Sequence, residues 1–542
     1  MASNSESGDV TNGHGRVNAD AVNLDGEKDP QAVRELGRLT DNTSTIEGFA
    51  GYMKHLNNVL SHHNVEARGI QRVPTSERIE RLRWTNIVQM FLLWFSVNLA
   101  ANNITLGMLG PAVYALSFKD SALTSVFGAL VGSIPVAYLA TFGPLSGNRT
   151  MIFARYTMGW WPSRLIAVLN IIVSIGYALI DCVIAGQILS AVSPHGSLSI
   201  VVGIIIVAVI TWVVTSFGIR IFHHYERWAF LPQLIAIIIA FSVTAKHYTL
   251  TTPSSGSPAT VTGNRISFFS LCLSAAITYS GAACDYFVYY PPQTPRIILF
   301  TLILLSLTCS FTLTFLLGIG LASALPTLTT WSTAYNTSQG ALLVTSLTSS
   351  PLHHAFGSFI SILVALGLIA NLIPPTYSSA LNLQILSPTL ALVPRVFWNT
   401  LCVITYTACA LTGRNYLASI FTNFLALMGY WVAIWVSITL EEHLLFRRSS
   451  HINFRSESSL AGPYNWEVWN QREKLPVGIA ALMAFLVGWV GAVLCMAQVW
   501  YVGPIAGLVG EFGADLGNYV GFLWAGVVYP VLRYWEIKRF GR

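Results

Sequence analysis

Residues 98–116 read NLAANNITLGMLGPAVYAL, an apolar stretch interrupted by three asparagines, a threonine, two glycines and a proline. Proline cannot donate to the hydrogen-bond ladder of a helix, and glycine weakens a helix through its backbone freedom. Crowded into a stretch long enough to cross a bilayer, such residues are typical of a membrane helix that breaks partway along. We therefore expect a helix break that involves Asn103, Gly107, Gly110 and Pro111.

The composition around this stretch is too apolar for a soluble protein. Hydrophobic residues make up 53% of the 542 residues and charged residues only 10%, and the mean hydropathy is +0.57. Soluble domains carry about 25% charged residues, so this chain cannot build a surface for water. Because unpaired backbone groups are costly in lipid and no ten-residue alternation suggests a barrel, we expect an all-α integral membrane protein.

Apolar windows that can cross a bilayer core of roughly 30 Å recur down the chain, and we expect about twelve transmembrane helices. Residues 1–75 are polar and poor in aromatics, which predicts a disordered cytoplasmic tail before a transporter-sized domain at 76–540. The tail has no basic start followed by an apolar run, so we expect no cleaved signal peptide. The expected spans are 87–114, 121–143, 163–192, 198–219, 228–245, 267–290, 297–324, 355–387, 395–412, 416–440, 476–500 and 515–535.

The distribution of Lys and Arg predicts the orientation. If the N-terminus is cytoplasmic, nearly all the basic residues of the loops fall on that side, and the other side receives only Lys119, Lys246, Arg265 and Arg414. Because cytoplasmic loops are enriched in Lys and Arg, we expect both termini in the cytoplasm, most simply at the plasma membrane. The net charge of +6 then needs no nucleic-acid partner.

The seven cysteines predict neither a disulfide framework nor a metal site. All of them fall within expected spans, and no pair has the spacing of metal ligands, so we expect no metal and no cofactor. The sequon at Asn336 lies in a loop expected outside, where it could be glycosylated. The sequons at Asn42 and Asn148 fall on the expected cytoplasmic side, where glycosylation is not expected.

Two further spans carry residues that interrupt a helix. Residues 272–292 read CLSAAITYSGAACDYFVYYPP, with Gly281 at mid-span, and residues 367–381 read GLIANLIPPTYSSAL, with Pro374 and Pro375. Transporters built from inverted repeats bind substrate where matching helices of the two repeats break. A five-plus-five inverted repeat pairs span 1 with span 6 and span 3 with span 8. The expected repeats and final spans are 87–245, 267–440 and 476–535.

A carboxylate lies near the middle of the third span, which reads SIGYALIDCVIAGQIL at 174–189. An ionised carboxylate in lipid costs at least about 2.5–3.5 kcal/mol, so Asp181 should face a wet cavity, be protonated or have a partner. Tyr177 lies one turn before it, so both point from one helix face. We expect Tyr177 and Tyr279 to sandwich a flat ligand, and Asp181 and Asn371 to bind its edge.

Asp285 lies one turn past the expected break in span 6, and two interpretations stay open. It could carry a coupling proton, or it could be a structural acid bonded to a neighbouring helix. For Glu441 and Glu442, next to Arg447 and Arg448, we expect a solvated salt-bridge face.

These motifs resemble the fungal purine-cytosine permeases of the nucleobase-cation-symport-1 family over nearly everything after residue 70. The resemblance rests on GMLGPAVYALSF at 107–118, FGPLSGNRTMIFARYTMGWWPSRL at 142–165, EEHLLFRR at 441–448, YNWEVW at 464–469 and the end VVYPVLRYWEIKRFGR. It is nearer to the vitamin B6 permease branch than to the cytosine permeases. The resemblance implies a LeuT-like bundle of twelve spans, a five-plus-five repeat with two extra helices, and proton-coupled uptake of N-heteroaromatics.

The chain departs from the family pattern at the expected site. The family usually has tryptophan at the positions of Tyr177 and Tyr279 and an amide at the position of Asp181. Its N-N-I-P-N motif is N-L-I-P-P here, so Asn371 stays while Leu372 and Pro375 replace amides. A carboxylate only accepts hydrogen bonds, whereas an amide also donates them. The departures therefore favour a ligand with a donor-rich or protonatable edge.

We thus expect a secondary-active symporter, not an enzyme, that imports purine- or cytosine-type nucleobases or a related N-heteroaromatic with protons. Sodium is the competing cation. The alternatives are a vitamin B6 (pyridoxine) permease, a transporter of a secondary-metabolite heterocycle, and a non-transporting nutrient sensor. A membrane enzyme would need a clustered His/Asp, Ser/His or Cys/His set, and the spans carry almost no histidine.

Overall fold

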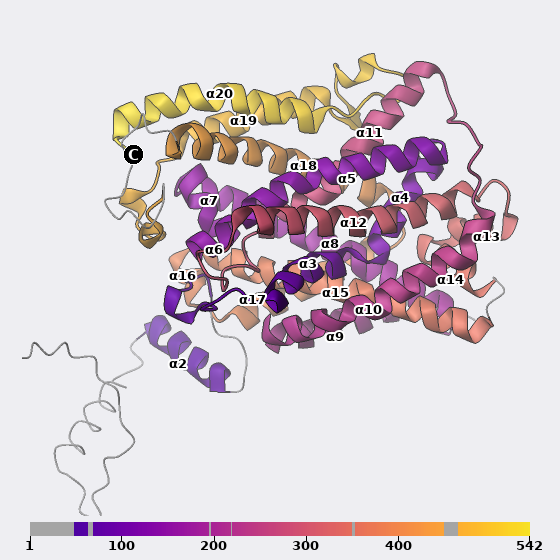
Figure 1. The fold of residues 1–542 in the computed structure, drawn as a ribbon, viewed down its shortest axis with the longest axis horizontal. Coiled ribbons are helices and arrows are strands. Elements are labelled where there is room, and N and C mark those ends of the chain that lie inside the picture. Colours follow the sequence, from indigo (N-terminus) through magenta and orange to yellow (C-terminus); the bar gives the residue numbers. More distant parts are fainter. Residues whose placement is uncertain (1–47, 63–68, 194–196, 218, 350–352, 449–463) are drawn as a thin grey trace, which may run out of the picture. The chain divides into compact units, whose positions relative to one another are not determined.

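The computed structural model describes residues 48–62, 69–193, 197–217, 219–349, 353–448 and 464–542, so most of the expected tail, residues 1–47, lies outside the described residues. Residues 57–542 form one compact unit. Its long helices run side by side along the horizontal of Figure 1.

The first half of the unit alternates long helices with short ones. After the single turn η1 (Thr75–Glu77), the helices are α3 (Trp84–Asn98), α4 (Ala101–Ala112), α5 (Phe118–Ala140), α6 (Phe142–Ser146), α7 (Thr150–Met158), α8 (Pro162–Val192), α9 (Ile200–Phe217), α10 (Ile219–Thr244) and η3 (Ala245–His247).

The second half repeats this alternation and ends in two further long helices. Its elements are α11 (Pro258–Ile277), η4 (Thr278–Ala282), α12 (Arg296–Ser323), α13 (Thr329–Thr337), α14 (Gln339–Thr348), α15 (His354–Leu386), α16 (Pro388–Leu392), α17 (Arg395–Gly413), α18 (Leu417–Glu441), the π-helical turn η5 (Glu442–Arg447), η6 (Trp466–Val468), η7 (Arg472–Lys474), α19 (Ile479–Cys495), η8 (Ala506–Leu508) and α20 (Gly517–Phe540). Strands β1 (Ala497–Gln498) and β2 (Tyr501–Val502) pair antiparallel between α19 and α20.

In the described residues, eight helices are long and apolar enough to cross a membrane, and the bent pair α3–α4 makes a ninth. The other three expected spans correspond to α11, α19 and α20, which fall short of that length or hydropathy. The helical membrane fold is confirmed, and a total of twelve spans stays a prediction.

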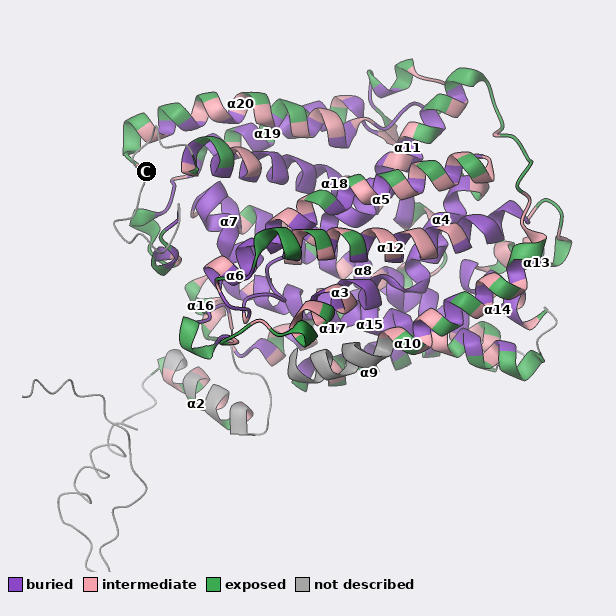
Figure 2. Cartoon of the chain, in the orientation of Figure 1, coloured by how far each residue is buried: buried purple, intermediate pink, exposed green. Residues whose placement is uncertain are grey.

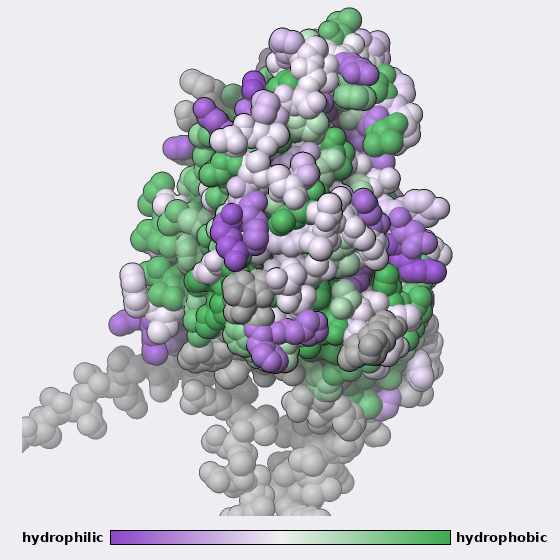
Figure 3. Space-filling model, turned by 90° about the vertical axis from the view of Figure 1, so that its right-hand side faces the viewer, coloured by the Kyte–Doolittle hydropathy of each residue, from purple (hydrophilic) through white to green (hydrophobic). Residues whose placement is uncertain are grey.

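The long helices bury one face and expose apolar side chains on the other, as the purple and green of Figure 2 show. On α9, for example, Gly203 and Val207 are buried while Val202, Ile206 and Val209 are exposed. Green hydrophobic residues also line the flanks of the face seen in Figure 3. A soluble protein rarely exposes such continuous apolar faces, so we assign them to lipid.

The helices fall into two packed groups. Helices α3, α4, α5, α11 and α12 pack mainly on one another, and α8, α9, α15 and α17 form the second group. Glycines bring the helices of the first group close together, because a Cβ on Gly107 would overlap the carbonyl oxygen of Phe315 on α12. Small residues at such crossings are typical of helix packing in membranes.

The break in the first span comes earlier than expected. Helix α3 ends at Asn98 and α4 begins at Ala101, with a bend of 56° between them. Gly107, Gly110 and Pro111 therefore lie inside α4 and not at the break, whereas Asn103, also in α4, reaches the break through its side-chain amide. The two glycines serve close packing instead: Gly110 faces Ser121 and Phe268, and Gly107 faces α12. Pro111 occupies the last turn of α4.

Two further expectations need correction. Pro374 and Pro375 do not break α15, which runs on to Leu386. Membrane helices tolerate proline because neighbouring groups satisfy the freed backbone. Within the expected disordered tail the structure has a helix, α2 (Gly48–His62), and Ile70 and Val73 are already buried.

The expectation of a solvated salt-bridge face is wrong for Glu442, which is fully buried. Its carboxylate accepts hydrogen bonds from Arg533 at 2.9 and 3.1 Å, from Arg447 at 2.8 Å and from the Tyr529 hydroxyl at 2.8 Å. The sequence does not place α20 against this end of α18, and that contact supplies Arg533 and Tyr529.

Candidate functional site

Three asparagine amides replace the helical hydrogen bonds lost between α3 and α4. Asn98 Nδ2 donates to the Trp94 carbonyl at 3.0 Å, Asn103 Nδ2 to the Asn98 carbonyl at 2.9 Å, and Asn371 Nδ2 to the Val97 carbonyl at 2.6 Å. The last carbonyls of a helix have no partner within the helix, so these side chains make the break stable in an apolar interior.

A second break follows α11, which ends at Ile277. The chain continues as the 3₁₀ turn η4 and then as turns, so Gly281 lies beyond the α-helix. Asn170 of α8 donates to the Gly281 carbonyl at 3.2 Å. A Cβ on Gly281 would overlap the Asn170 side chain, so only glycine lets α8 approach this closely.

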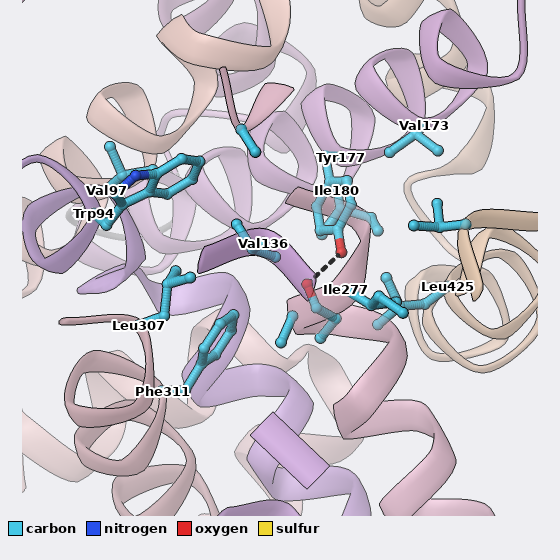
Figure 4. Close-up of a cluster of buried hydrophobic side chains, with 14 of the residues drawn as sticks. Trp94, Val97, Val136, Val173, Tyr177, Ile180, Ile277, Leu307, Phe311 and Leu425 are labelled. Atoms are coloured by element: carbon cyan, nitrogen blue, oxygen red, sulfur yellow. Dashed lines mark hydrogen bonds between the residues drawn. The ribbon is translucent and has the colours of Figure 1, made fainter. Parts of the chain in front are cut away.

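The two expected tyrosines meet next to this second break. Tyr177 of α8 lies among buried side chains, as the close-up in Figure 4 shows. Its hydroxyl shares a hydrogen bond with the Thr278 hydroxyl at 2.7 Å and lies 3.1 Å from the Ala275 carbonyl oxygen. Its ring centroid lies 6.0 Å from that of Tyr279, with an angle of 34° between the planes. A ring sandwiched between them would need about 7 Å, twice a van der Waals contact. The tyrosines would therefore separate by about 1 Å to sandwich a ligand.

Hydrogen bonds connect the tyrosine pair to the first break. Asn371 Nδ2 lies 3.3 Å from the Tyr279 hydroxyl, and Asn371 Oδ1 accepts from Asn102 Nδ2 at 3.2 Å. Trp94 of α3 packs edge-on against Tyr279, with centroids 5.5 Å apart. Asn371 of α15 thus contacts both broken segments.

Asp181 lies at the centre of these contacts. The residue is fully buried, and neither carboxylate oxygen has a hydrogen-bond partner. The side chains of Asn102 and Tyr279 are close enough to interact with it electrostatically. Buried polar groups nearly always have a partner, so an unpaired buried carboxylate marks a place where a proton or a ligand binds.

Asp285 has a different environment. Its Oδ1 accepts from the backbone N–H of Thr150 at 2.7 Å and from the Thr150 hydroxyl at 2.9 Å, and its Oδ2 accepts from Ser378 at 3.1 Å. Arg149 donates to its backbone carbonyl at 2.6 Å. The carboxylate therefore anchors the N-terminus of α7, where the helix dipole favours a negative charge.

The structure brings Tyr177, Asp181, Tyr279 and Asn371 together. Asp285 instead forms its hydrogen bonds with residues of α7 and α15. Sequence reasoning omitted Thr278, Trp94 and Asn102 from the site. Asn102 had a detectable signal, since it lies in the polar cluster of the first span, but Thr278 and Trp94 join the site only through tertiary contacts.

The other sequence predictions concern a metal site and glycosylation, and not the residues of this site. Within the described ranges, no group of three or more His, Cys, Asp or Glu side chains could hold a metal ion. Asn336 is exposed on α13, and Asn148 is buried. Residue 42, the third sequon, lies outside the described residues.

A helical membrane protein with two broken helices around a buried polar and aromatic site belongs to the class of transporters that bind small solutes at mid-membrane. The chain matches the family described as permeases for cytosine/purines, uracil, thiamine and allantoin over residues 73–510, and it belongs to that family. The nucleobase-cation-symport-1 assignment is thereby confirmed. The protein is a multi-pass membrane transporter and not an enzyme.

Two relatives come from Saccharomyces cerevisiae. The chain is 32% identical to the vitamin B6 transporter TPN1 over 518 residues, which covers 88% of each chain. It is 33% identical to the purine-cytosine permease FCY21 over 501 residues, which covers 92% of each. These nearly equal identities do not decide whether the chain is nearer to the vitamin B6 transporters or to the purine-cytosine permeases.

Among solved structures, the fold is similar to that of Mhp1, a nucleobase-cation-symport-1 family transporter, in a closed conformation with bromovinylhydantoin bound. The TM-score is 0.56 at 13% identity, and the match covers 88% of this chain and 96% of Mhp1. The similarity supports the LeuT-like fold.

Proposed function

We propose that this protein is a secondary-active symporter that imports a small N-heteroaromatic solute with protons. The solute stacks on Tyr177 and Tyr279, and its edge donates hydrogen bonds to Asp181 and binds Asn371. The observation that carries the proposal is the fully buried Asp181 carboxylate, unpaired beside two aromatic rings and two broken helices.

Asp181 is also the better candidate to carry the coupling proton. Asp285 already accepts three hydrogen bonds and lies beside Arg149, and each of these interactions favours its charged form. Asp181 has weaker support, from the nearby Asn102 side chain, and its charged form is costly without a cation or a donor-rich ligand. A proton on Asp181 and a cationic ligand edge are therefore alternative ways of neutralising the same group. Sodium stays the competing cation.

Transport would proceed by alternating access. The group formed by α3, α4, α5, α11 and α12 would rock against the rest, since its members pack mainly on one another. Tyr177 and Asp181 belong to the other group and Tyr279 follows α11, so the proposed site lies between the two moving parts. The distribution of Lys and Arg favours both termini in the cytoplasm at the plasma membrane, and the inward proton gradient there would set the net direction.

The experiment is uptake of labelled adenine, cytosine and pyridoxine by cells that lack their own permeases, at pH 5 and pH 7, with and without a protonophore. The proposal expects uptake of at least one compound that is faster at pH 5 and abolished by the protonophore. Uptake that needs sodium and ignores the protonophore contradicts proton coupling. No uptake of any of the three contradicts the proposed substrate class and leaves a secondary-metabolite carrier or a nutrient sensor.

Pyridoxine is the second candidate substrate. Its ring carries hydroxyl donors and a protonatable nitrogen, which suit a carboxylate better than the largely neutral edge of cytosine does. Uptake of pyridoxine without uptake of adenine or cytosine would identify pyridoxine as the substrate among the three compounds.

A further inference from the structure

A cavity of about 310 Å³ is lined by residues other than those of the transport site. It is enclosed by α7, the start of α8, the end of α15, α16 and the segment around η6, and α7 and α16 lie at the same end of the helices in Figure 1. We call it the basic pocket. Its defining residues are Arg155, Trp160, Arg164, Gln384, Leu392 and Trp469.

The pocket carries positive charge without an acid to balance it. Its lining contains Arg155 and Arg164 and neither Asp nor Glu. Arg155 donates only to neutral acceptors, among them the Trp469 carbonyl at 3.1 Å and the Asn470 side chain at 3.2 Å. In the described part of the chain, neither arginine forms an ion pair.

Indole rings hold these arginines in place. The Arg155 guanidinium lies 4.6 Å from the Trp160 ring, and that of Arg164 lies 4.3 Å from Trp161. Stacking occupies the flat faces of a guanidinium and leaves N–H groups at its edge for a phosphate. Burial and the nearby charge of Arg164 lower the pKa of Arg155 to about 10, so it stays cationic at neutral pH.

The pocket also contains a buried acceptor without a partner. Gln384 is 2% exposed, and its Nε2 donates to the Val393 carbonyl at 2.9 Å. Its Oε1 has no hydrogen-bond partner. A ligand that presents a hydroxyl near its phosphate would satisfy this oxygen.

An apolar stripe on α8 begins beside the pocket. Trp161, Leu165, Val168 and Ile172 follow the spacing of one helix face, and all four are exposed. Leu392, which lines the pocket, is a further exposed apolar residue. Because Trp161 and Leu165 directly follow the pocket residues Trp160 and Arg164 in the chain, pocket and stripe together suit a molecule with an anionic head and an apolar chain.

We propose that the basic pocket binds phosphatidylinositol from the leaflet at this arginine-rich end. The phosphate binds Arg155 and Arg164, an inositol hydroxyl donates to Gln384 Oε1, and an acyl chain lies along the α8 stripe. The lipid would join α7, α8 and α15 at their common end. This site is separate from the transport site and does not depend on which solute is carried.

The test uses the full-length protein purified in a neutral detergent. Its melting temperature is measured against increasing dioleoyl-phosphatidylinositol, dioleoyl-phosphatidylcholine, or soluble inositol 1-phosphate. Arg164→Gln is the variant, because Arg164 is half-buried and its side chain donates no hydrogen bond to the described residues. Arg414→Gln is the control, since it removes a half-buried arginine beyond α17 at the other end of the helices.

Phosphatidylinositol should raise the melting temperature more than phosphatidylcholine. Arg164→Gln should weaken the apparent affinity about fivefold, the change that one basic residue near an anionic membrane surface makes, while Arg414→Gln should not. Equal effects of the two lipids, or an unchanged affinity in Arg164→Gln, would overturn the proposal. An equal shift from inositol 1-phosphate would also overturn it, because the site would then bind a soluble anion.

Discussion

Asp181 is the residue whose substitution separates the possible ligands. Asp181→Asn replaces an acceptor by a group that both accepts and donates, at nearly constant volume. We expect uptake of a ligand with a donor-rich or cationic edge to fall about tenfold or more, the value of a charge-assisted hydrogen bond, and uptake of neutral nucleobases to rise. Competition assays with the three labelled compounds measure both effects.

Asp285→Asn is the matched control for this prediction. Its remaining oxygen can still accept from Thr150, and its amide can donate to the Ser378 hydroxyl, so α7 should stay anchored. If Asp181 carries the proton, Asp181→Asn loses the preference for pH 5 while Asp285→Asn keeps it. The reverse pattern assigns coupling to Asp285. No change for any ligand in Asp181→Asn removes Asp181 from the site.

For single residues, the sequence predicts which side chains converge but not how they are arranged. Tyr177 and Asp181 share a helix face by spacing alone, and the expected break in span 6 brings in Tyr279. Asn371 is expected from a break in span 8 that α15 does not have. The 6.0 Å separation of the rings and the hydrogen bond to Thr278 depend on how α8 meets α11, which no local pattern encodes.

Among the elements, α4 owes its close contact with α12 to Gly107. Gly107→Ala should destabilise the protein by roughly 1–3 kcal/mol, because the added methyl group overlaps backbone of α12 that cannot move away cheaply. The lowered melting temperature of the purified protein checks this. Gly507→Ala, whose Cβ would meet only Val502 at 3.6 Å, should leave the melting temperature nearly unchanged. Equal effects of the two substitutions would show that the glycine contact does not stabilise the helix pair.

Helix positions follow from hydropathy better than helix breaks do. The expected span 163–192 matches α8 closely, and the span 297–324 matches α12. The short helices α6, α7, α13, α14 and α16 give no signal, since they are too short to cross a bilayer. Pro374 and Pro375 fit inside α15 because proline weakens a helix locally without having to end it.

On the scale of the whole molecule, the Glu442 carboxylate connects the last helix to the rest. Glu442→Gln would leave the buried Arg533 guanidinium with Glu536, at 3.4 Å, as its remaining acidic partner in the described residues, and would present an N–H group to donors. Breaking a buried ion pair from one side typically costs about 3–5 kcal/mol, so we expect a large fall in melting temperature.

Glu441→Gln is the neighbouring control, because Glu441 is half-buried and takes part in no ion pair of the described residues. Its melting temperature should change little. The double variant Glu442→Leu/Arg533→Met should recover part of the loss, since an apolar pair carries no desolvation cost. A Glu442→Gln protein as stable as the wild type would contradict a structural role for the network.

The amides that support the first helix break divide the site into two kinds of position. Asn98 and Asn103 bind only backbone carbonyls, and Tyr177 and Asp181 take no part in holding the break, whereas Asn371 bonds both the Val97 carbonyl and the Tyr279 hydroxyl. In the proposed site, we therefore expect substrate range to evolve through Tyr177 and Asp181 while the backbone scaffold stays constant. We expect a change at Asn371 to alter scaffold and selectivity together, so a new substrate should be hardest to acquire there by a single mutation.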